Sequence, residues 1–238
     1  MDYSLKLFSS LIKRMTPASQ CTSEKSIAAG WTMHYTEFPW LEGIIESMKK
    51  DGEYSVSRND LIRTNDKRER LIKIIFWGFP NAYRSNWTLR NILLNVNRII
   101  TLLPDYGARL REDDYLSLFD ALNQIDGMKE STISKILCFW EIKVASSEAI
   151  IVDQFVRECS HLFYELWGTS VLYPYSAEDN LFVVKKVNRL SRKIGATPQQ
   201  LECFLFNTGK VVKANRLSLF RQLLQFSGVN VSEDTEEE

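Results

Sequence analysis

Apolar residues recur at three- and four-residue intervals along almost the whole chain, which is the spacing of one face of an α-helix. The pattern is clearest where Ile133, Ile136, Leu137 and Trp140 form a single stripe. It predicts helices over residues 5–14, 40–49, 67–77, 88–103, 114–124, 131–142, 154–167, 179–194, 198–208 and 213–226. Strand signals are few: residues 53–57 alternate weakly, and residues 150–152 form a short apolar run. The pattern therefore predicts a mostly α fold.

The distribution of these helices predicts two lobes. The helices within residues 58–170 form one helical core, and residues 1–57 and 171–228 are expected to pack together as a second helical lobe. Residues 229–238 are strongly acidic and are expected to form a disordered tail. A chain of 238 residues with 45% hydrophobic residues is long enough to bury a substantial core.

The formal net charge is zero, which would ordinarily argue against a nucleic-acid-binding protein. The charge is, however, segregated along the chain. Five of the last six residues are acids, whereas residues 58–111 carry +7 and residues 185–222 carry +8. Neutrality therefore does not exclude a basic DNA-binding face. Five bases in the first basic stretch are expected to contact phosphates: Arg58, Arg63, Lys67, Arg68 and Arg70.

The remaining composition points to a cytoplasmic protein. No apolar stretch approaches the roughly 20 residues needed to span a bilayer, and the N-terminus does not resemble a signal peptide. The cysteines have no metal-binding spacing and are expected to be reduced, buried thiols: Cys21, Cys138, Cys159 and Cys203. We expect a monomer that uses no metal and no cofactor and has no contact with a membrane.

Residues 122–142 predict two helices joined by a tight turn around Gly127. The backbone N–H groups and the positive dipole end at the start of the second helix would bind a phosphate without reading sequence. Lys129 and Lys135 would strengthen this contact. A loop of small residues and the run 150–152 then lead to Asp153, at the start of the next predicted helix.

The stretch IDGMKESTISKIL, followed by Ile150-Ile151-Val152-Asp153, resembles the helix-hairpin-helix–GPD superfamily of DNA glycosylases. In that superfamily a catalytic aspartate follows the hairpin glycine by a little over twenty residues. Asp153 follows Gly127 by 26. The stretches LIKIIFWGFPNAYRSN and NVNRII also resemble its 8-oxoguanine glycosylase-like branch, of which this chain would be a divergent bacterial member.

The resemblance implies an enzyme that flips a modified base out of double-stranded DNA and hydrolyses its N-glycosidic bond. Asp153 would stabilise the oxocarbenium-like transition state; without the resemblance, it would be interpreted as the N-cap of helix 154–167. Ser131 stands where strand-cleaving relatives carry a lysine, so we expect a monofunctional glycosylase. Lys135, one helical turn later, is the alternative amine of a bifunctional glycosylase/lyase.

The resemblance also implies contacts with DNA and a pocket for the flipped base. The expected DNA-binding residues are Gly127, Lys129, Ser131, Thr132, Asn95, Asn97, Arg98 and Arg84. Asn95 and Asn97 lie in the segment that fills the hole left by the base. The expected base pocket contains Trp77, Phe79, Ser131 and Phe139, and its aromatic rings would stack on the base.

The sequence leaves the substrate and the biological role open. The resemblance suggests either an oxidised purine and DNA repair, or a bulky modified cytosine such as glucosylated hydroxymethylcytosine of phage DNA and antiviral defence. The rival interpretation from another class is a catalytically inactive DNA-binding protein that uses the hairpin only to bind phosphates.

Overall fold

The structure is a computed structural model that describes residues 4–81, 86–160, 162–166 and 176–213. Helices make up most of this part of the chain, so the predicted mostly α class is confirmed. The helices are η1 (Leu5–Phe8), α1 (Ser9–Lys13), η2 (Pro17–Ser19), α2 (Ala29–Thr32), α3 (Pro39–Glu46), α4 (Arg58–Arg63), α5 (Lys67–Gly78), α6 (Asn86–Leu94), α7 (Val96–Leu102), α8 (Glu112–Asn123), α9 (Glu130–Phe139), α10 (Gln154–Ser160), η3 (Tyr164–Leu166), α11 (Ala177–Ile194) and α12 (Pro198–Lys213).

Two small sheets accompany the helices. The first has the order β1 (Cys21–Glu24), β3 (Glu53–Ser57), β2 (Lys49–Lys50) and is antiparallel throughout, with Cys21 opposite Ser57. The second has the order β4 (Arg109–Leu110), β5 (Lys143–Val144), β6 (Ser147–Glu148), with β4 and β5 parallel. The weak alternation over residues 53–57 therefore corresponds to β3, the central strand of the first sheet.

Local sequence signals explain where several helices begin and end. Ser57 and Asp60 form a capping box at the start of α4, and Ser176 and Asp179 form another at the start of α11. Helix α11 ends at Gly195, which adopts a left-handed conformation with φ of 70°. These caps satisfy backbone groups that the helices themselves leave unpaired.

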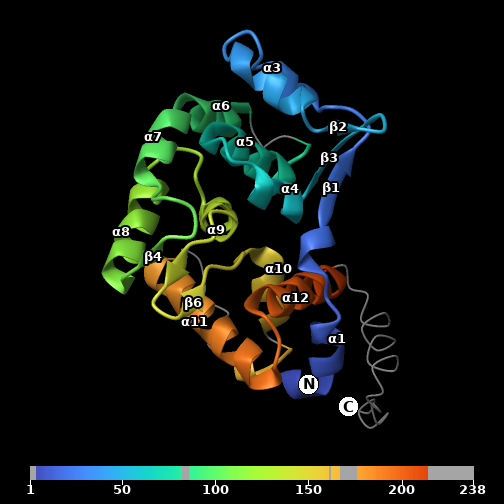
Figure 1. Cartoon of the computed structure of the whole chain (residues 1–238), viewed down its shortest axis with the longest axis vertical. Helices are drawn as coiled ribbons and strands as arrows, with labels where there is room; N and C mark the ends of the chain where they lie inside the picture. Colours follow the sequence, from blue (N-terminus) through green and yellow to red (C-terminus); the bar gives the residue numbers. More distant parts are fainter. Residues whose placement is uncertain (1–3, 82–85, 161, 167–175, 214–238) are drawn as a thin grey trace, which may run out of the picture.

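Helix α9 lies at the centre of the molecule (Figure 1). Every residue from Thr132 to Phe139 is buried, and the helix contacts α4, α5 and α8. Helices α10 and α12 pack closely against each other below α9 in Figure 1. The loop that leads from α9 to α10 therefore joins the central helix to the α10–α12 pair.

The structure corrects several details of the predicted elements. The helix expected over 154–167 ends at Ser160 as α10, and the short η3 follows it. The helix expected over 88–103 is divided at Asn95 into α6 and α7. The apolar run 150–152 is buried but belongs to neither sheet. Its Val152 instead exchanges hydrogen bonds with the Ser134 hydroxyl, which accepts from the Val152 N–H at 3.1 Å and donates to its carbonyl at 3.2 Å. The expected helix 213–226 and the acidic tail 229–238 lie outside the described residues, apart from Lys213 at the end of α12.

The predicted lobes contact each other through several elements. Helix α12 contacts both α1 and α10, and β1 and β3 contact α5, so close packing crosses the predicted boundaries. Across the described ranges, no helix combines the length and apolar character that a membrane span requires. The four cysteines are free thiols, and three of them are buried.

Candidate active site

The turn before α9 depends on Gly127. Its φ is 91°, a left-handed conformation that L side chains rarely adopt. A Cβ at this position would lie 2.6 Å from the backbone carbonyl oxygen of Thr88 in α6. Ile125 and Met128 are buried on either side and anchor the turn in the core. The turn that connects α8 to α9 therefore also packs directly against α6.

Replacing Gly127 with alanine should distort this turn. The variant Gly127→Ala introduces both the unfavourable φ and the contact with Thr88, so we expect it to lose about 1–3 kcal/mol of unfolding free energy. Thermal denaturation and the affinity for duplex DNA would measure the effect. As a control, Gly107→Ala also has a positive φ of 74° but has no atom within 4 Å of the added Cβ. Equal stability losses in the two variants would contradict a role for the Thr88 contact.

The side chain of Lys135 is buried within the site, with 6% of the residue exposed. Its Nζ atom donates a hydrogen bond to Ser131 Oγ at 2.6 Å and lies 4.0 Å from Asp153 Oδ2. Helix α5 ends beside the lysine stem, where a Cβ at Gly78 would approach Lys135 Cδ to 3.1 Å. The amine also lies 5.6 Å from the centre of the Phe79 ring. Its position is thus fixed by polar partners on one side and by close packing on the other.

Asp153 uses its two carboxylate oxygens for different purposes. Oδ1 accepts hydrogen bonds from the backbone N–H groups of Phe155 at 2.9 Å and Val156 at 3.2 Å. These bonds give Asp153 the geometry of an N-cap for α10. Oδ2 is the oxygen that faces the Lys135 amine. The capping interaction therefore holds the carboxylate in place while one oxygen remains directed at the amine.

The buried environment changes the chemistry of Lys135. Burial lowers the pKa of its amine below the usual value of 10.5, and the Asp153 and Glu202 carboxylates only partly oppose this shift. Burial also raises the pKa of the neighbouring Cys138 thiol to about 12. At neutral pH the Cys138 thiol is therefore protonated and a poor nucleophile.

A second buried ion pair connects α4 to α12 close to this amine. The Arg58 guanidinium donates to both carboxylate oxygens of Glu202, at 2.7 and 2.9 Å, and its Nε donates to Gln20. The arginine lies 5.5 Å from the Trp77 ring and 5.6 Å from the Phe139 ring. Although burial lowers the pKa of Arg58, interaction with Glu202 raises it above its usual value, so the guanidinium stays charged.

This arrangement corrects the phosphate-binding role expected for Arg58 and Arg70. Both side chains are buried. Arg70 donates hydrogen bonds to the backbone carbonyls of Thr64 and Phe139 inside the core. Glu202 was not predicted as a site residue from the sequence. Its only signal was that it is the single acid within the basic stretch 185–222.

The residues expected in the base pocket are brought together, but they are not equally accessible. Trp77 and Phe139 are buried and pack edge to face, with ring centres 5.2 Å apart. Phe79 is only partly buried and lies beside the Lys135 amine. Ser131 is also partly buried and is the hydrogen-bond partner of that amine. Phe79 and Ser131 are therefore better placed than the other two to reach a base.

The expected DNA-binding residues occupy several environments. Lys129 and Arg98 are exposed, whereas Thr132 is buried in the first turn of α9. The Asn95 amide donates to the carbonyl of Asn91 at 2.8 Å. Asn97 is exposed, and its oxygen accepts a hydrogen bond from Arg68 at 3.1 Å. Arg84 lies outside the described residues.

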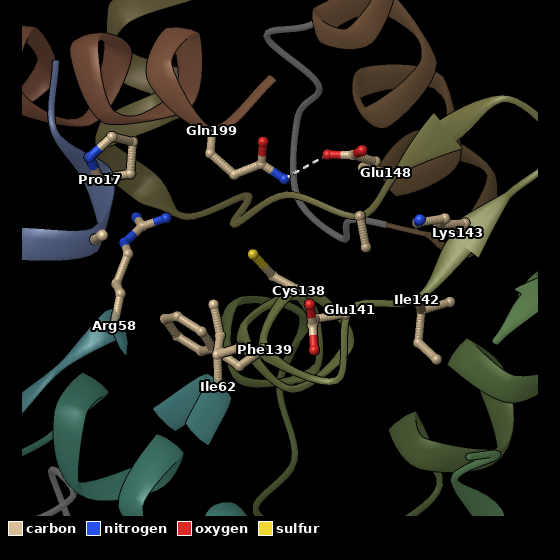
Figure 2. Close-up of a pocket in the computed structure, with 12 residues that line it drawn as sticks. Pro17, Arg58, Ile62, Cys138, Phe139, Glu141, Ile142, Lys143, Glu148 and Gln199 are labelled. Atoms are coloured by element: carbon tan, nitrogen blue, oxygen red, sulfur yellow. Dashed lines mark hydrogen bonds between the residues drawn. The ribbon is translucent and has the colours of Figure 1, made fainter. Parts of the chain in front are cut away.

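A cavity of about 360 Å³ lies between α4, α9, α12 and the β5–β6 hairpin. Figure 2 shows Arg58, Cys138 and Phe139 on one side of it and a hydrogen bond from Gln199 to Glu148 on the other. That bond, from Gln199 Nε2 to Glu148 Oε2, is 2.7 Å long. Cys138 follows Lys135 by three residues, which places both on one side of α9. The cavity therefore begins about one helical turn beyond the buried amine.

A sequence model of the family described as "Putative 8-oxoguanine DNA glycosylase OGG-like protein" matches residues 21–206. This match covers most of the chain, including the turn at Gly127, Lys135, Asp153 and Glu202. The chain belongs to this family. No curated protein and no solved structure matches the chain. This family is in keeping with the branch of DNA glycosylases that the sequence resembles.

Proposed function

We propose that the protein is a DNA glycosylase that removes a modified base, with Asp153 and Lys135 as its catalytic pair. The observation that carries this proposal is the buried Lys135 amine, held by Ser131 and directed toward the Asp153 carboxylate at 4.0 Å. Membership of the glycosylase-like family makes duplex DNA with a modified base the expected partner.

The chemistry follows from the two groups. As the bond between the base and C1′ breaks, its electron pair leaves with the base and positive charge develops on the sugar. The Asp153 carboxylate can stabilise that charge. The neutral Lys135 amine can attack C1′, lose a proton and form a Schiff base as the sugar ring opens. Elimination of the 3′ phosphate from that Schiff base would then cut the strand.

The position of Lys135 thus favours the bifunctional alternative over the monofunctional enzyme that Ser131 suggests. A solvated surface lysine would be largely protonated at neutral pH, whereas burial gives Lys135 a larger neutral fraction. Ser131 does not supply the amine itself, but its hydroxyl holds the amine of Lys135.

Borohydride reduction should trap a covalent complex between the protein and substrate DNA. We expect the Lys135→Met variant to lose this adduct, because it removes the amine while keeping most of the buried volume. The exposed Lys50→Gln is the matched control and should trap normally. Base release without any adduct in the unmodified protein would establish the monofunctional mechanism instead. Neither release nor trapping on any modified DNA would overturn the proposed function.

The trapping rate should increase with pH as the Lys135 amine loses its proton. Because burial lowers the pKa of the amine below 10.5, the rate should reach its plateau at a lower pH than an ordinary lysine would give. Single-turnover trapping across a pH series would measure this. If the trapping rate instead kept rising up to the pH at which a solvated lysine loses its proton, that result would contradict a buried nucleophile.

The substrate remains a choice between two classes. The family description favours an oxidised purine and a role in DNA repair. The cavity beyond Lys135, with the polar groups of Glu148 and Gln199 on its wall, supports the alternative of a bulky modified cytosine and antiviral defence. Mass spectrometry of bases released from oxidised DNA and from phage DNA with modified cytosines would separate the two.

A further inference from the structure

Trp87 is the most exposed large hydrophobic residue in the described part of the chain, at 65% exposure. Trp31, Trp77 and Trp140 are buried in the core, and Trp40 is partly buried. An indole ring held in water is informative because it gains nothing from the hydrophobic core. The ring of Trp87 therefore offers apolar surface that a partner could contact.

Trp87 lies in the first turn of α6, beside the turn that leads to the active site. The next residue, Thr88, supplies the carbonyl oxygen that would lie 2.6 Å from a Cβ on Gly127. Leu89, Ile92 and Leu93 are buried and hold α6 firmly against the core. The helix turn that carries Trp87 thus packs against the turn at Gly127, and Lys135 lies eight residues further along the chain.

Base flipping creates a place for a flat apolar group. Rotating a base out of the duplex leaves a gap in the stack, and a flat apolar ring can fill it by stacking on the neighbouring bases. Asn95 and Asn97, the residues expected in that role, have amides that already bond to Asn91 and Arg68. The exposed turn beside Gly127 carries both Asp126 and Lys129, so its charge does not select a partner, and the choice of DNA follows from the proposed function.

We propose that Trp87 is the wedge that enters the DNA stack when the target base leaves it. This inference rests on the proposed glycosylase function. It can nevertheless be tested without catalysis, because a duplex with a tetrahydrofuran abasic-site analogue already contains the gap that the ring would fill.

The binding test compares Trp87→Ala, Trp87→Phe and Leu94→Ala with the unmodified protein. Leu94 is a suitable control because it is an exposed apolar residue, 53% exposed, at the other end of the same helix. We expect the unmodified protein to prefer the tetrahydrofuran duplex over an intact one and Trp87→Ala to reduce that preference about tenfold. Trp87→Phe should retain most of it, and Leu94→Ala should retain all of it. An unchanged preference in Trp87→Ala would overturn the proposal.

A catalytic test separates the wedge from a general binding role. Trp87→Ala should slow base release from a paired target about tenfold, but it should have a smaller effect when the target lies opposite an abasic site and is already unpaired. Equal losses on the two substrates would overturn the wedge. If no DNA loses a base while the preference for the tetrahydrofuran duplex still depends on Trp87, the proposed function fails and the wedge stands.

Discussion

Asp153→Asn should abolish base release while leaving DNA binding nearly unchanged. The amide can still accept the hydrogen bonds from Phe155 and Val156, so the cap of α10 is preserved. It cannot supply the negative charge that stabilises an oxocarbenium-like sugar, and we expect a loss on the order of 10²–10³-fold in the single-turnover rate. Single-turnover base release and equilibrium binding to the same duplex would measure the two properties separately.

Asp66→Asn provides the matched control. Asp66 is also a helix N-cap, and its Oδ1 accepts from the Glu69 N–H at 2.7 Å, but it is exposed at the start of α5. This variant should release bases at the normal rate. Full activity in Asp153→Asn would show that the carboxylate only caps α10. A protein that binds DNA but never releases a base would be the inactive hairpin protein that the sequence left as a rival.

Gly209→Ala should strongly destabilise the protein. Gly209 lies where α12 meets α10, and a Cβ there would overlap the backbone carbonyl of Phe155. Because backbone cannot rotate away as a flexible side chain can, α10 must shift, at a cost of about 1–3 kcal/mol or more. Asp153 caps α10, so the shift should also reduce base release. Thermal denaturation and single-turnover kinetics would measure the two effects.

Gly43→Ala is the opposite control. Gly43 lies within α3 and has no atom within 4 Å of the added Cβ. Alanine should therefore stabilise the helix by about 0.5–1 kcal/mol, because glycine loses more backbone entropy on folding. Equal stability of Gly209→Ala and Gly43→Ala would contradict the close approach of α10 and α12.

The periodic pattern predicted the central part of the fold well because burial there follows a regular helical face. The stripe from Ile133 to Trp140 is fully buried, and only Trp140 lies just beyond the end of α9. The turn predicted at Gly127 lies where the backbone adopts a left-handed conformation. The pattern could not predict the break at Asn95. The apolar spacing continues across it, and the break depends on one residue leaving the helical conformation, with φ of −100° and ψ of 8°.

The site was predictable only where its parts are close in sequence. Lys135 and Ser131 are one turn apart, and Asp153 follows within the same stretch, so spacing and resemblance could place them together. Arg58 and Glu202 are separated by 144 positions, and each resembles an ordinary charged residue of a helix in a basic region. Their pairing depends on how α4 and α12 meet, which no local pattern encodes.

That long-range pair also affects the order in which the protein can mature. Lys135 is synthesised before its surroundings are complete. Glu202, the carboxylate partner of Arg58, is added to the chain 67 residues later. A chain that ends before residue 202 lacks the carboxylate partner of Arg58, whose positive charge acts on Lys135. The charged surroundings of Lys135 are complete only when segments from both halves of the chain have come together.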